Sequence, residues 1–246
     1  MKVKGRTVSE TGAREIGRRV AHVLRLDEDL SEFYALAADD PDLVWVTSGA
    51  GRLIRSATVF EEVVKTICTT NCSWGATRKM VSALVHHLGE PAVGASDDSP
   101  LGRAFPTPEA MASVDERFYK NVVRSGYRSR YLLTLARDVA DGVIDLEALA
   151  KASPDELSDV ELTESLLALP GVGPYAAAHI MMMMGRYSAL ILDSWTRPKY
   201  ARLIGRKTVS DAAIVRRFKR YERWAGLAFW LFLTRDWIDD DPPRAS

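Results

Sequence analysis

Residues 169–178 read LPGVGPYAAA, which places two prolines and two glycines between a leucine-rich run and an alanine-rich run. Pro170 ends the first run as a helix, because proline lacks an amide hydrogen and its ring clashes with the helical backbone. Gly171 and Gly173 permit positive φ and leave the backbone amides uncovered by a side chain. Pro174 suits the first position of a new helix. The stretch therefore predicts a tight hairpin between two helices.

Such a hairpin points bare amides outward at a helix N-terminus, where the helix dipole also favours negative charge. This arrangement binds an anion, most naturally a phosphate. Proline-glycine turns also join helices without any binding role, so the turn by itself leaves both interpretations open. If it binds phosphate, we expect the contacts at Leu169, Gly171, Val172, Gly173, Tyr175 and Ala176.

The rest of the 246-residue sequence also has a helical pattern. Apolar residues recur at helical spacing, and we expect helix caps at Ser56 or Thr58 and at Thr107. Strand signals are weak and confined to residues 43–47 and 189–193. The predicted fold is therefore mainly α.

Composition excludes several classes of protein. No apolar run approaches the roughly 20 residues that span a bilayer, and the charged N-terminus lacks the apolar core of a signal peptide. We therefore expect a cytoplasmic protein, associated with the nucleoid if bacterial. Cys68 and Cys72 are expected to be reduced, and the four histidines have no zinc-type spacing with them, so no metal site is predicted.

The net charge is zero, but the charges are unevenly distributed. Ten basic residues lie between Arg197 and Arg223, and only Asp211 and Glu222 oppose them. Such an asymmetry can form a polyanion-binding face on a neutral protein. A solvated helix face with scattered cations is the alternative interpretation.

A longer stretch, LLALPGVGPYAAA at 166–178 followed by LILDSWTRPKYAR at 190–202, resembles the helix-hairpin-helix motif and downstream aspartate of the helix-hairpin-helix (HhH-GPD) DNA glycosylase superfamily. Residues 60–91 and 125–139 resemble helices of its 3-methyladenine DNA glycosylase II and 8-oxoguanine DNA glycosylase members. The similarity covers roughly residues 25 to 235, and the hairpin with the aspartate is its most specific part.

The resemblance implies two helical lobes that flank a DNA-binding cleft, with the helix-hairpin-helix motif (163–185) at its edge. We expect one lobe from 1–58 and 188–246 and the other from 59–187. The residues before 25 are too few for the sheet-bearing N-terminal domain of these relatives. Two interpretations stay open: the chain is a minimal core of this fold, or it was trimmed from a longer natural chain.

The implied reaction is hydrolysis of the N-glycosidic bond of a base flipped out of duplex DNA, which leaves an abasic site. Its oxocarbenium-like transition state needs a nearby negative charge, and Asp193 lies at the position of the superfamily's aspartate. We expect Asp193 to stabilise this cation and to orient or deprotonate water. Asp193 is equally placed to cap the next helix, and the two roles are compatible.

Two departures from the superfamily's pattern narrow the mechanism. Relatives with lyase activity carry a lysine two positions after the second hairpin glycine, and Tyr175 stands there, so we predict a monofunctional glycosylase. No cysteine follows Cys72, so the iron–sulfur cluster of some relatives is not expected. No cofactor is required on this interpretation, and a monovalent cation at the hairpin remains open.

The resemblance also suggests residues that contact DNA. Asn71 matches an asparagine that fills the space left by the flipped base, although it could equally cap a helix break. Trp195, Trp74 and Tyr175 are candidates for the base pocket, and the two tryptophans could instead be core residues. Candidate phosphate contacts are Arg197, Lys199, Arg202, Arg128 and Arg130.

The expected partner is double-stranded DNA with a damaged or modified base, bound by a monomer without a membrane. An alkylated purine in base excision repair is favoured as the substrate. The alternatives are a bulky or hypermodified phage-type base removed in defence, a non-catalytic helix-hairpin-helix DNA-binding module, and a helical scaffold for protein partners.

Overall fold

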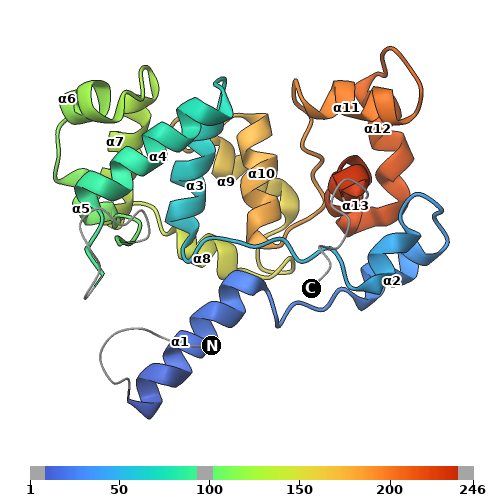
Figure 1. Cartoon of the computed structure of the whole chain (residues 1–246), viewed down its shortest axis with the longest axis horizontal. Coiled ribbons are helices and arrows are strands. Elements are labelled where there is room, and N and C mark those ends of the chain that lie inside the picture. Colours follow the sequence, from blue (N-terminus) through green and yellow to red (C-terminus); the bar gives the residue numbers. More distant parts are fainter. Residues whose placement is uncertain (1–8, 93–101, 238–246) are drawn as a thin grey trace, which may run out of the picture. The chain divides into compact units, whose positions relative to one another are not determined.

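The computed structural model describes residues 9–92 and 102–237 of the chain. Within these ranges the backbone is built from helices (Figure 1), and the recorded β pairing is an isolated bridge between Pro91 and Arg103. None of the described helices is both long enough and apolar enough to cross a bilayer. The predicted mainly α fold is confirmed.

The chain divides into two compact units that differ from the predicted lobes at their boundaries. Unit 1 comprises the residues up to Val23 and Ser56–Ala176, and unit 2 comprises Leu24–Arg55 and the residues from Ala177 onward. The segment before Leu24 thus groups with the central segment, whereas the prediction placed it with the C-terminal one. The second boundary falls within a helix, α10 (Pro174–Met184), rather than after it.

Unit 1 contains the hairpin and most of the helices. Its elements are α1 (Glu10–Leu24, which ends at the boundary), α3 (Val59–Thr69), α4 (Trp74–Leu88), α5 (Pro108–Ala112), α6 (Glu116–Phe118), the π-helical turn η2 (Tyr119–Val123), α7 (Arg128–Ala140), α8 (Leu146–Lys151), α9 (Asp159–Leu167) and the start of α10.

Unit 2 contains the elements on either side of unit 1 in the sequence. They are α2 (Ser31–Ala38), η1 (Val44–Ser48), the remainder of α10, α11 (Thr196–Leu203), α12 (Asp211–Phe218), η3 (Lys219–Trp224), α13 (Ala225–Thr234) and η4 (Arg235–Trp237).

The helices begin where local chemistry favours it. The Thr58 hydroxyl accepts a hydrogen bond from the Glu61 amide at the start of α3, so Thr58 rather than Ser56 is the cap. Thr107 caps α5 with Pro108 in its first turn, as predicted. These hydroxyls satisfy amides that have no partner inside the helix.

The two predicted strands are not strands. Residues 44–48 form the 3-10 helix η1, whose three-residue period brings the buried side chains of Leu43 and Val46 to the same side. Residues 189–193 are irregular chain between α10 and α11. Just before them, the Tyr187 carbonyl accepts a hydrogen bond of 2.6 Å from the Gly226 amide of α13, so this segment is held by a helix instead of a sheet.

Unit 2 is organised around aromatic rings. Tyr200, Phe218, Phe229 and Phe232 are buried, and their ring centroids lie 5.2–6.0 Å apart. α13 is buried along its whole length and supplies two of these rings. Apolar burial of this kind is the main favourable contribution to folding.

A buried carboxylate ties α2 to the C-terminal helices of unit 2. Asp40 is 1% exposed, and its Oδ2 accepts hydrogen bonds from Tyr221 Oη at 2.5 Å, from Arg217 Nη2 at 2.8 Å and from Arg220. Burial by itself would raise the pKa of Asp40, but the hydrogen bonds from Tyr221 and Arg217 outweigh it and lower the pKa from 3.8 to about 2.

This lowered pKa predicts an acid-dependent loss of stability. Because the folded-state pKa lies below the unfolded value, the contribution of Asp40 is complete above about pH 4 and is lost as the pH falls toward about 2. We expect the free energy of unfolding of wild type to fall by about 2 kcal/mol more than that of Asp40→Asn over this range, measured by urea denaturation. Asp155→Asn, at an exposed carboxylate, serves as the control. The same loss of stability with falling pH in wild type and in Asp40→Asn would contradict the prediction.

Candidate functional site

The hairpin joins α9 to α10 and depends on one glycine for its shape. Gly171 has φ +78°, and a Cβ placed there would lie 2.7 Å from Cδ2 of Tyr131. Gly173 does not adopt the positive φ that glycine permits, and a Cβ there would meet no atom within 4 Å. Gly171 is therefore required by backbone conformation and packing, whereas Gly173 leaves the outer side of the hairpin open.

The hairpin presents main chain rather than side chains. Leu169, Val172 and Ala176 are buried, so their side chains anchor the turn and only their backbones can reach a ligand. The Val172 amide donates to the Leu169 carbonyl at 3.2 Å, whereas within the described ranges no hydrogen bond is recorded from the amides of Gly171 and Gly173. Both glycines are partly exposed, and amides without a partner just before an α-helix are suited to bind an anion.

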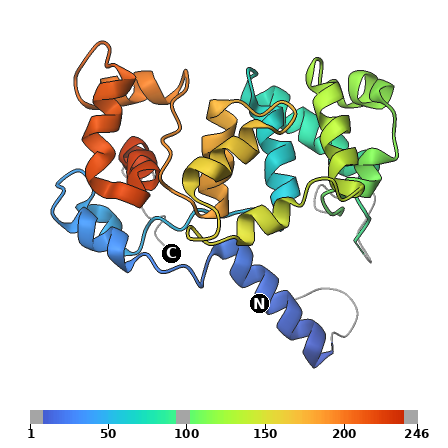
Figure 2. The same cartoon turned by 180° about the vertical axis from the view of Figure 1, so that it is seen from behind.

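The turn between α3 and α4 lies beside the hairpin in unit 1. The Tyr175 hydroxyl is 3.3 Å from Thr69 Oγ1, and α3 and α4, which this turn joins, are neighbours in both views (Figures 1 and 2). Asn71 is exposed at this turn with φ +43°, a conformation that asparagine tolerates better than most residues. Tyr175 thus links the start of α10 to the end of α3 in unit 1, and Asn71 follows that helix end by two residues.

Arg128 has a structural role, and its prediction as a phosphate contact is corrected. Its side chain is buried and donates to the Ile67 carbonyl at 3.2 Å, to Thr70 Oγ1 at 3.2 Å and to the Thr70 carbonyl. These carbonyls lie at the C-terminus of α3, where a cation also complements the helix dipole. Arg128 therefore fixes the turn that carries Asn71, while Arg130 is exposed and remains available to a ligand.

Asp193 in unit 2 is held as a helix cap. Its Oδ1 accepts hydrogen bonds from the Trp195 amide at 2.8 Å and the Thr196 amide at 2.6 Å, and its own amide donates to Thr196 Oγ1 at 2.8 Å. Within the described part of the chain, no hydrogen bond to Oδ2 is recorded. One oxygen is thus fixed by the start of α11, and the other has no hydrogen-bond partner among the described residues.

Three tryptophans gather next to this carboxylate in unit 2. The Trp195 ring lies 5.9 Å from that of Trp230 and 6.1 Å from that of Trp237, centroid to centroid. Trp195 and Trp237 are exposed, so the cluster offers ring surface to solvent. Trp195 is therefore not a core residue. Trp74 is also exposed, at the first position of α4 in unit 1.

A small cavity of about 140 Å³ in unit 2 adjoins the same cluster. Its lining residues are Leu53, Ile54, His179, Met182, Met183, Ile191 and Trp230. Ile191 belongs to the segment that ends at Asp193, and Trp230 contacts Trp195. This cavity is apolar apart from the imidazole of His179, as expected of a site that takes a flat ring.

The basic residues that follow Asp193 differ in availability. Lys199 is buried and forms an ion pair with Asp236, so its prediction as a phosphate contact is corrected. Arg197 forms a bidentate ion pair with Asp211, with distances of 2.7 and 2.9 Å. Arg202 is exposed.

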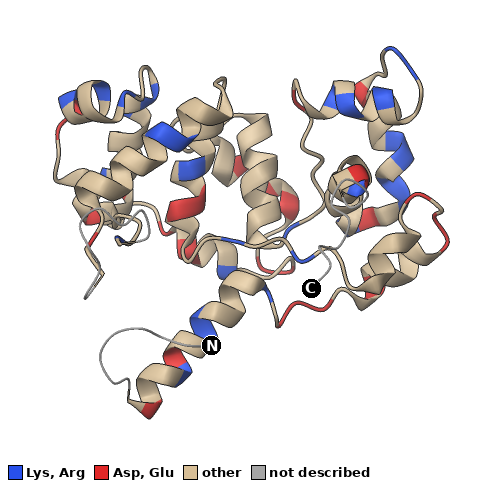
Figure 3. Ribbon diagram, in the orientation of Figure 1, with Lys and Arg blue, Asp and Glu red and all other residues tan. Residues whose placement is uncertain are grey.

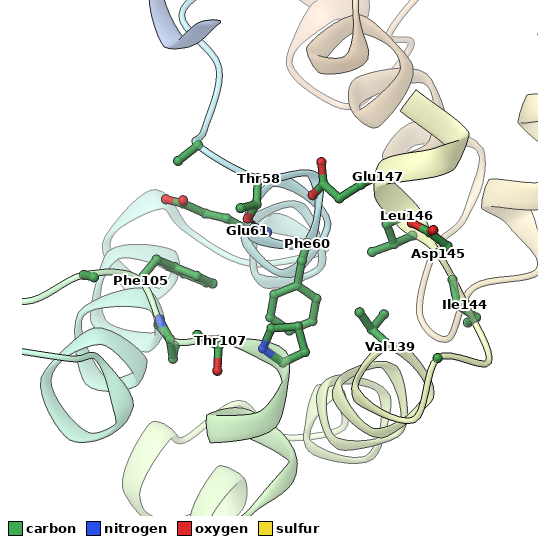
Figure 4. A pocket seen from close by; sticks show the side chains of 15 residues that line it. Thr58, Phe60, Glu61, Phe105, Thr107, Val139, Ile144, Asp145, Leu146 and Glu147 are labelled. Atoms are coloured by element: carbon green, nitrogen blue, oxygen red, sulfur yellow. Dashed lines mark hydrogen bonds between the residues drawn. The ribbon is translucent and has the colours of Figure 1, made fainter. Parts of the chain in front are cut away.

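A larger cavity of about 560 Å³ lies in unit 1 at the N-terminal end of α3 (Figure 4), whereas the contact with the hairpin is at the C-terminal end of that helix. Phe60, Phe105 and Val139 give it an apolar lining. Its three carboxylates have partners within the fold: Glu61 pairs with Lys65, Asp145 caps α8, and Glu147 accepts a hydrogen bond from the Val59 amide. These groups are used in folding, so the cavity is not the candidate catalytic site.

Sequence reasoning missed Trp230, Trp237 and His179. The tryptophan content of the last helix was a visible signal, but a pattern of local spacing does not show that Trp230 and Trp237 lie beside Trp195. His179 was considered only as a metal ligand. Among the described residues, no group of three or more histidine, cysteine, aspartate or glutamate side chains is placed to hold a metal ion.

Comparison with known proteins places these features in context. No family model matches the chain. A DNA-3-methyladenine glycosylase of Bacillus subtilis is 26% identical over 190 residues, which cover 74% of this chain and 58% of the relative. A second Bacillus subtilis relative is 22% identical and is covered over 43% of its length. The chain thus spans less than two thirds of these relatives.

Solved structures show the same fold. The apo 8-oxoguanine glycosylase/lyase of Clostridium acetobutylicum has a TM-score of 0.73 at 24% identity, covering 90% of this chain and 76% of that one. A 3-methyladenine DNA glycosylase from Archaeoglobus fulgidus has a TM-score of 0.70 at 20% identity, covering 94% and 78%. The predicted resemblance to 3-methyladenine and 8-oxoguanine DNA glycosylases is thus confirmed in sequence by the first relative and in fold by these structures.

The two hairpin glycines give a direct test of this geometry. We expect Gly171→Ala to lower the free energy of unfolding by about 1–2 kcal/mol or more, because alanine is strained at positive φ and its Cβ meets Tyr131. Gly173→Ala is the matched control, and we expect a change within about 0.5 kcal/mol. Urea denaturation measures both, and an equal loss of stability in the two variants would refute the assignment.

Proposed function

We propose that the chain is a monofunctional DNA glycosylase that flips a damaged or modified base out of duplex DNA and hydrolyses its N-glycosidic bond, with an alkylated purine as the favoured substrate. The observation that carries the proposal is Asp193, whose Oδ1 is fixed by two amides while Oδ2 remains unbonded within the described chain. The similarity to glycosylases in sequence and fold supports it.

Asp193 supplies the charge that the reaction needs. As the glycosidic bond breaks, positive charge develops at the sugar C1′, and a fixed carboxylate stabilises it without reorganising at the moment of reaction. The amides of Trp195 and Thr196 hold the carboxylate in one orientation. Its second oxygen can then orient water and accept a proton from it as the water attacks C1′.

The hairpin of unit 1 supplies the hold on the DNA backbone. The amides of Gly171 and Gly173, both partly exposed residues, suit a phosphate, and such contacts position a duplex without reading its sequence. Asn71, two residues after the end of α3, is placed to enter the space left by the extruded base. The proposed partner is thus double-stranded DNA, bound by a monomer that needs no cofactor.

The tryptophan cluster supports the alkylated purine as substrate. Alkylation of a ring nitrogen gives a purine a positive charge, which makes it a better leaving group and attracts it to the face of an aromatic ring. Trp195 and Trp237 expose ring surface beside Asp193, and Trp230 joins them to the small cavity. A neutral base would gain only stacking from the same rings.

Tyr175 supports hydrolysis without lyase chemistry. A lyase of this kind forms a Schiff base through an amine, and a phenol cannot form one. Tyr175 instead places its hydroxyl against Thr69 on α3. The Clostridium acetobutylicum protein of the same fold is a glycosylase/lyase, so the fold is compatible with either outcome.

Substitution of Asp193 tests the catalytic assignment. Asp193→Asn keeps the oxygen that caps α11 and removes the charge, so we expect base release to fall by at least about 100-fold with DNA affinity and melting temperature preserved. Release is measured under single-turnover conditions as alkali-revealed strand cleavage, on a panel of duplexes with one defined alkylated, oxidised or hypermodified base each. Asp211→Asn, a carboxylate of the same unit, is the control and should release base like wild type.

The same panel separates the competing functions. If base is released only from hypermodified phage DNA, the substrate is a hypermodified base and not an alkylated purine. Binding without release from any duplex would leave a non-catalytic DNA-binding module, and absence of salt-dependent DNA binding would favour a scaffold for protein partners.

A separate experiment tests the absence of lyase activity. We expect wild type to release the base but to leave the strand intact until alkali is added, because no amine occupies position 175. Borohydride added during turnover should trap no covalent protein–DNA adduct, as judged by gel electrophoresis with a glycosylase/lyase as the positive control. A trapped adduct would show that another amine attacks C1′.

A further inference from the structure

The ten basic residues between Arg197 and Arg223 fall into two groups in the structure. Five have acidic partners, and these pairs are Arg197 with Asp211, Lys199 with Asp236, Arg217 and Arg220 with Asp40, and Arg223 with Glu32. Among the other five, Arg202 lies close enough to Asp236 to help lower the pKa of that carboxyl. The group that remains consists of Arg206, Lys207, Arg216 and Lys219.

These four residues, called the second basic surface below, are exposed and have no ion pair with another described residue. Arg206 and Lys207 lie in the loop between α11 and α12, and Arg216 and Lys219 lie at the end of α12. Figure 3 shows basic residues along this loop and along α12.

Hydrogen bonds at both ends hold the loop between α11 and α12 in place. α11 ends at Leu203 and is soon followed by Gly205, which has φ +68°, and the Arg206 amide donates to the Ala201 carbonyl at 2.8 Å. This is the hydrogen-bonded ending typical of helices that stop at a glycine. The loop then enters α12 through the cap Ser210, whose side chain accepts from the Ala213 amide. Both ends of the loop that carries Arg206 and Lys207 are therefore held.

The basic residues of α12 and its C-terminal end differ in the direction that their side chains take. Ile214 and Phe218 are buried, and Arg217 turns inward to the buried Asp40. Arg216 and Lys219 are three positions apart, a spacing that places them on one side of a helix, and both are exposed. Asp40 thus neutralises the cations needed for folding, and those of the second basic surface keep their charge.

We propose that the second basic surface binds the phosphate backbone of duplex DNA, as a contact additional to the hairpin. α12 is about 12 Å long, and duplex DNA carries one charge per roughly 1.7 Å of its axis, so four cations along the loop and helix match several phosphates. The aromatic residues of 204–224, Phe218, Tyr221 and Trp224, are all buried. Because single-strand binding relies on exposed rings that stack on bases, this surface suits a duplex.

This inference rests on the proposed function, since it extends the DNA footprint of a glycosylase beyond the target base. Contacts to phosphates add affinity without sequence preference. The second basic surface would therefore hold undamaged DNA while the protein searches for its substrate, and it would contribute little to base release itself.

The test compares wild type with Arg206→Gln/Lys207→Gln/Arg216→Gln/Lys219→Gln. Binding to an undamaged duplex of about 30 base pairs is measured by fluorescence anisotropy from about 50 to 200 mM salt. Four phosphate contacts predict a salt slope smaller by about 3.6 in the variant, so wild type should lose about 100-fold more affinity than the variant over this range. The melting temperature should not change, because the four side chains are exposed.

The matched control is Arg14→Gln/Arg18→Gln/Arg19→Gln/Lys120→Gln, which removes the same charge from side chains that already have glutamate partners in unit 1. We expect it to keep the wild-type salt slope. A control that loses as much slope as the test variant, or a test variant with the wild-type slope, would overturn the inference. Reduced affinity for single-stranded RNA with unchanged duplex binding would also overturn it.

Base release separates failure of this inference from failure of the proposed function. On a duplex carrying the modified base, at protein concentrations that saturate binding, the test variant should release base at the wild-type rate. If wild type releases base and the salt slopes are equal, only the second basic surface is refuted. If wild type binds DNA in the expected salt-dependent way but releases no base from any duplex, the glycosylase is refuted and the surface stands.

Discussion

The course of the chain from α10 to Asp193 is set by a single buried arginine. Arg25 is 2% exposed, and its guanidinium donates to the Leu53 carbonyl at 2.6 Å and to the carbonyls of Met182, at 3.1 Å, and Met183 at the end of α10. The Met182 carbonyl also accepts from the Gly185 amide at 3.1 Å, and the arginine supplements the hydrogen bonding of this helix end and complements the helix dipole. α10 then stops at Gly185, with φ +90°, where a Cβ would lie 3.1 Å from Arg25 Nη1. The residue that ends the helix and the cation that holds its end therefore fit each other.

The segment after Gly185 is held as tightly as the helix before it. Tyr187 stacks on Trp224 with ring centroids 5.4 Å apart and donates a hydrogen bond to Glu28, and burial raises the pKa of its phenol. At Gly226 a Cβ would lie 2.2 Å from the Ala189 carbonyl, so only glycine allows α13 to approach this segment. The chain thus reaches Asp193 from two fixed points, and α11 fixes the carboxylate itself. Packing and capping thus share the task of holding the Asp193 carboxylate in one position.

Local chemistry explains which parts of this structure the sequence predicts. Proline and hydroxyl residues act within a few positions of themselves, so Pro174 as the start of α10 and Thr107 as a cap were readable from spacing. Buried ion pairs act over long separations, and no local pattern shows that Arg128 meets Thr70 or that Asp40 meets Arg217. The same limit applies to residues 44–48, where a run of β-branched residues forms a 3-10 helix because packing prevails over propensity. For the candidate site, Asp193 and the hairpin were found through a motif, whereas the tryptophans beside Asp193 become neighbours only when the chain folds.

The chain has no net charge, but its basic residues fall into two groups: some are bound inside the fold, and others are exposed and can contact a ligand. Arg25 and Arg128 lie inside the fold and bind helix C-termini, while Arg217 and Arg220 neutralise Asp40. A buried guanidinium is costly to desolvate unless its donors are satisfied, and in these residues carbonyls and carboxylates accept their hydrogen bonds. Cations used in this way cannot also bind a phosphate, so a count of basic residues overstates the surface available to a polyanion. Pairing therefore decides which basic residues can act on a ligand, and it separates the structural role of Arg128 from the exposed Arg130 only two positions away.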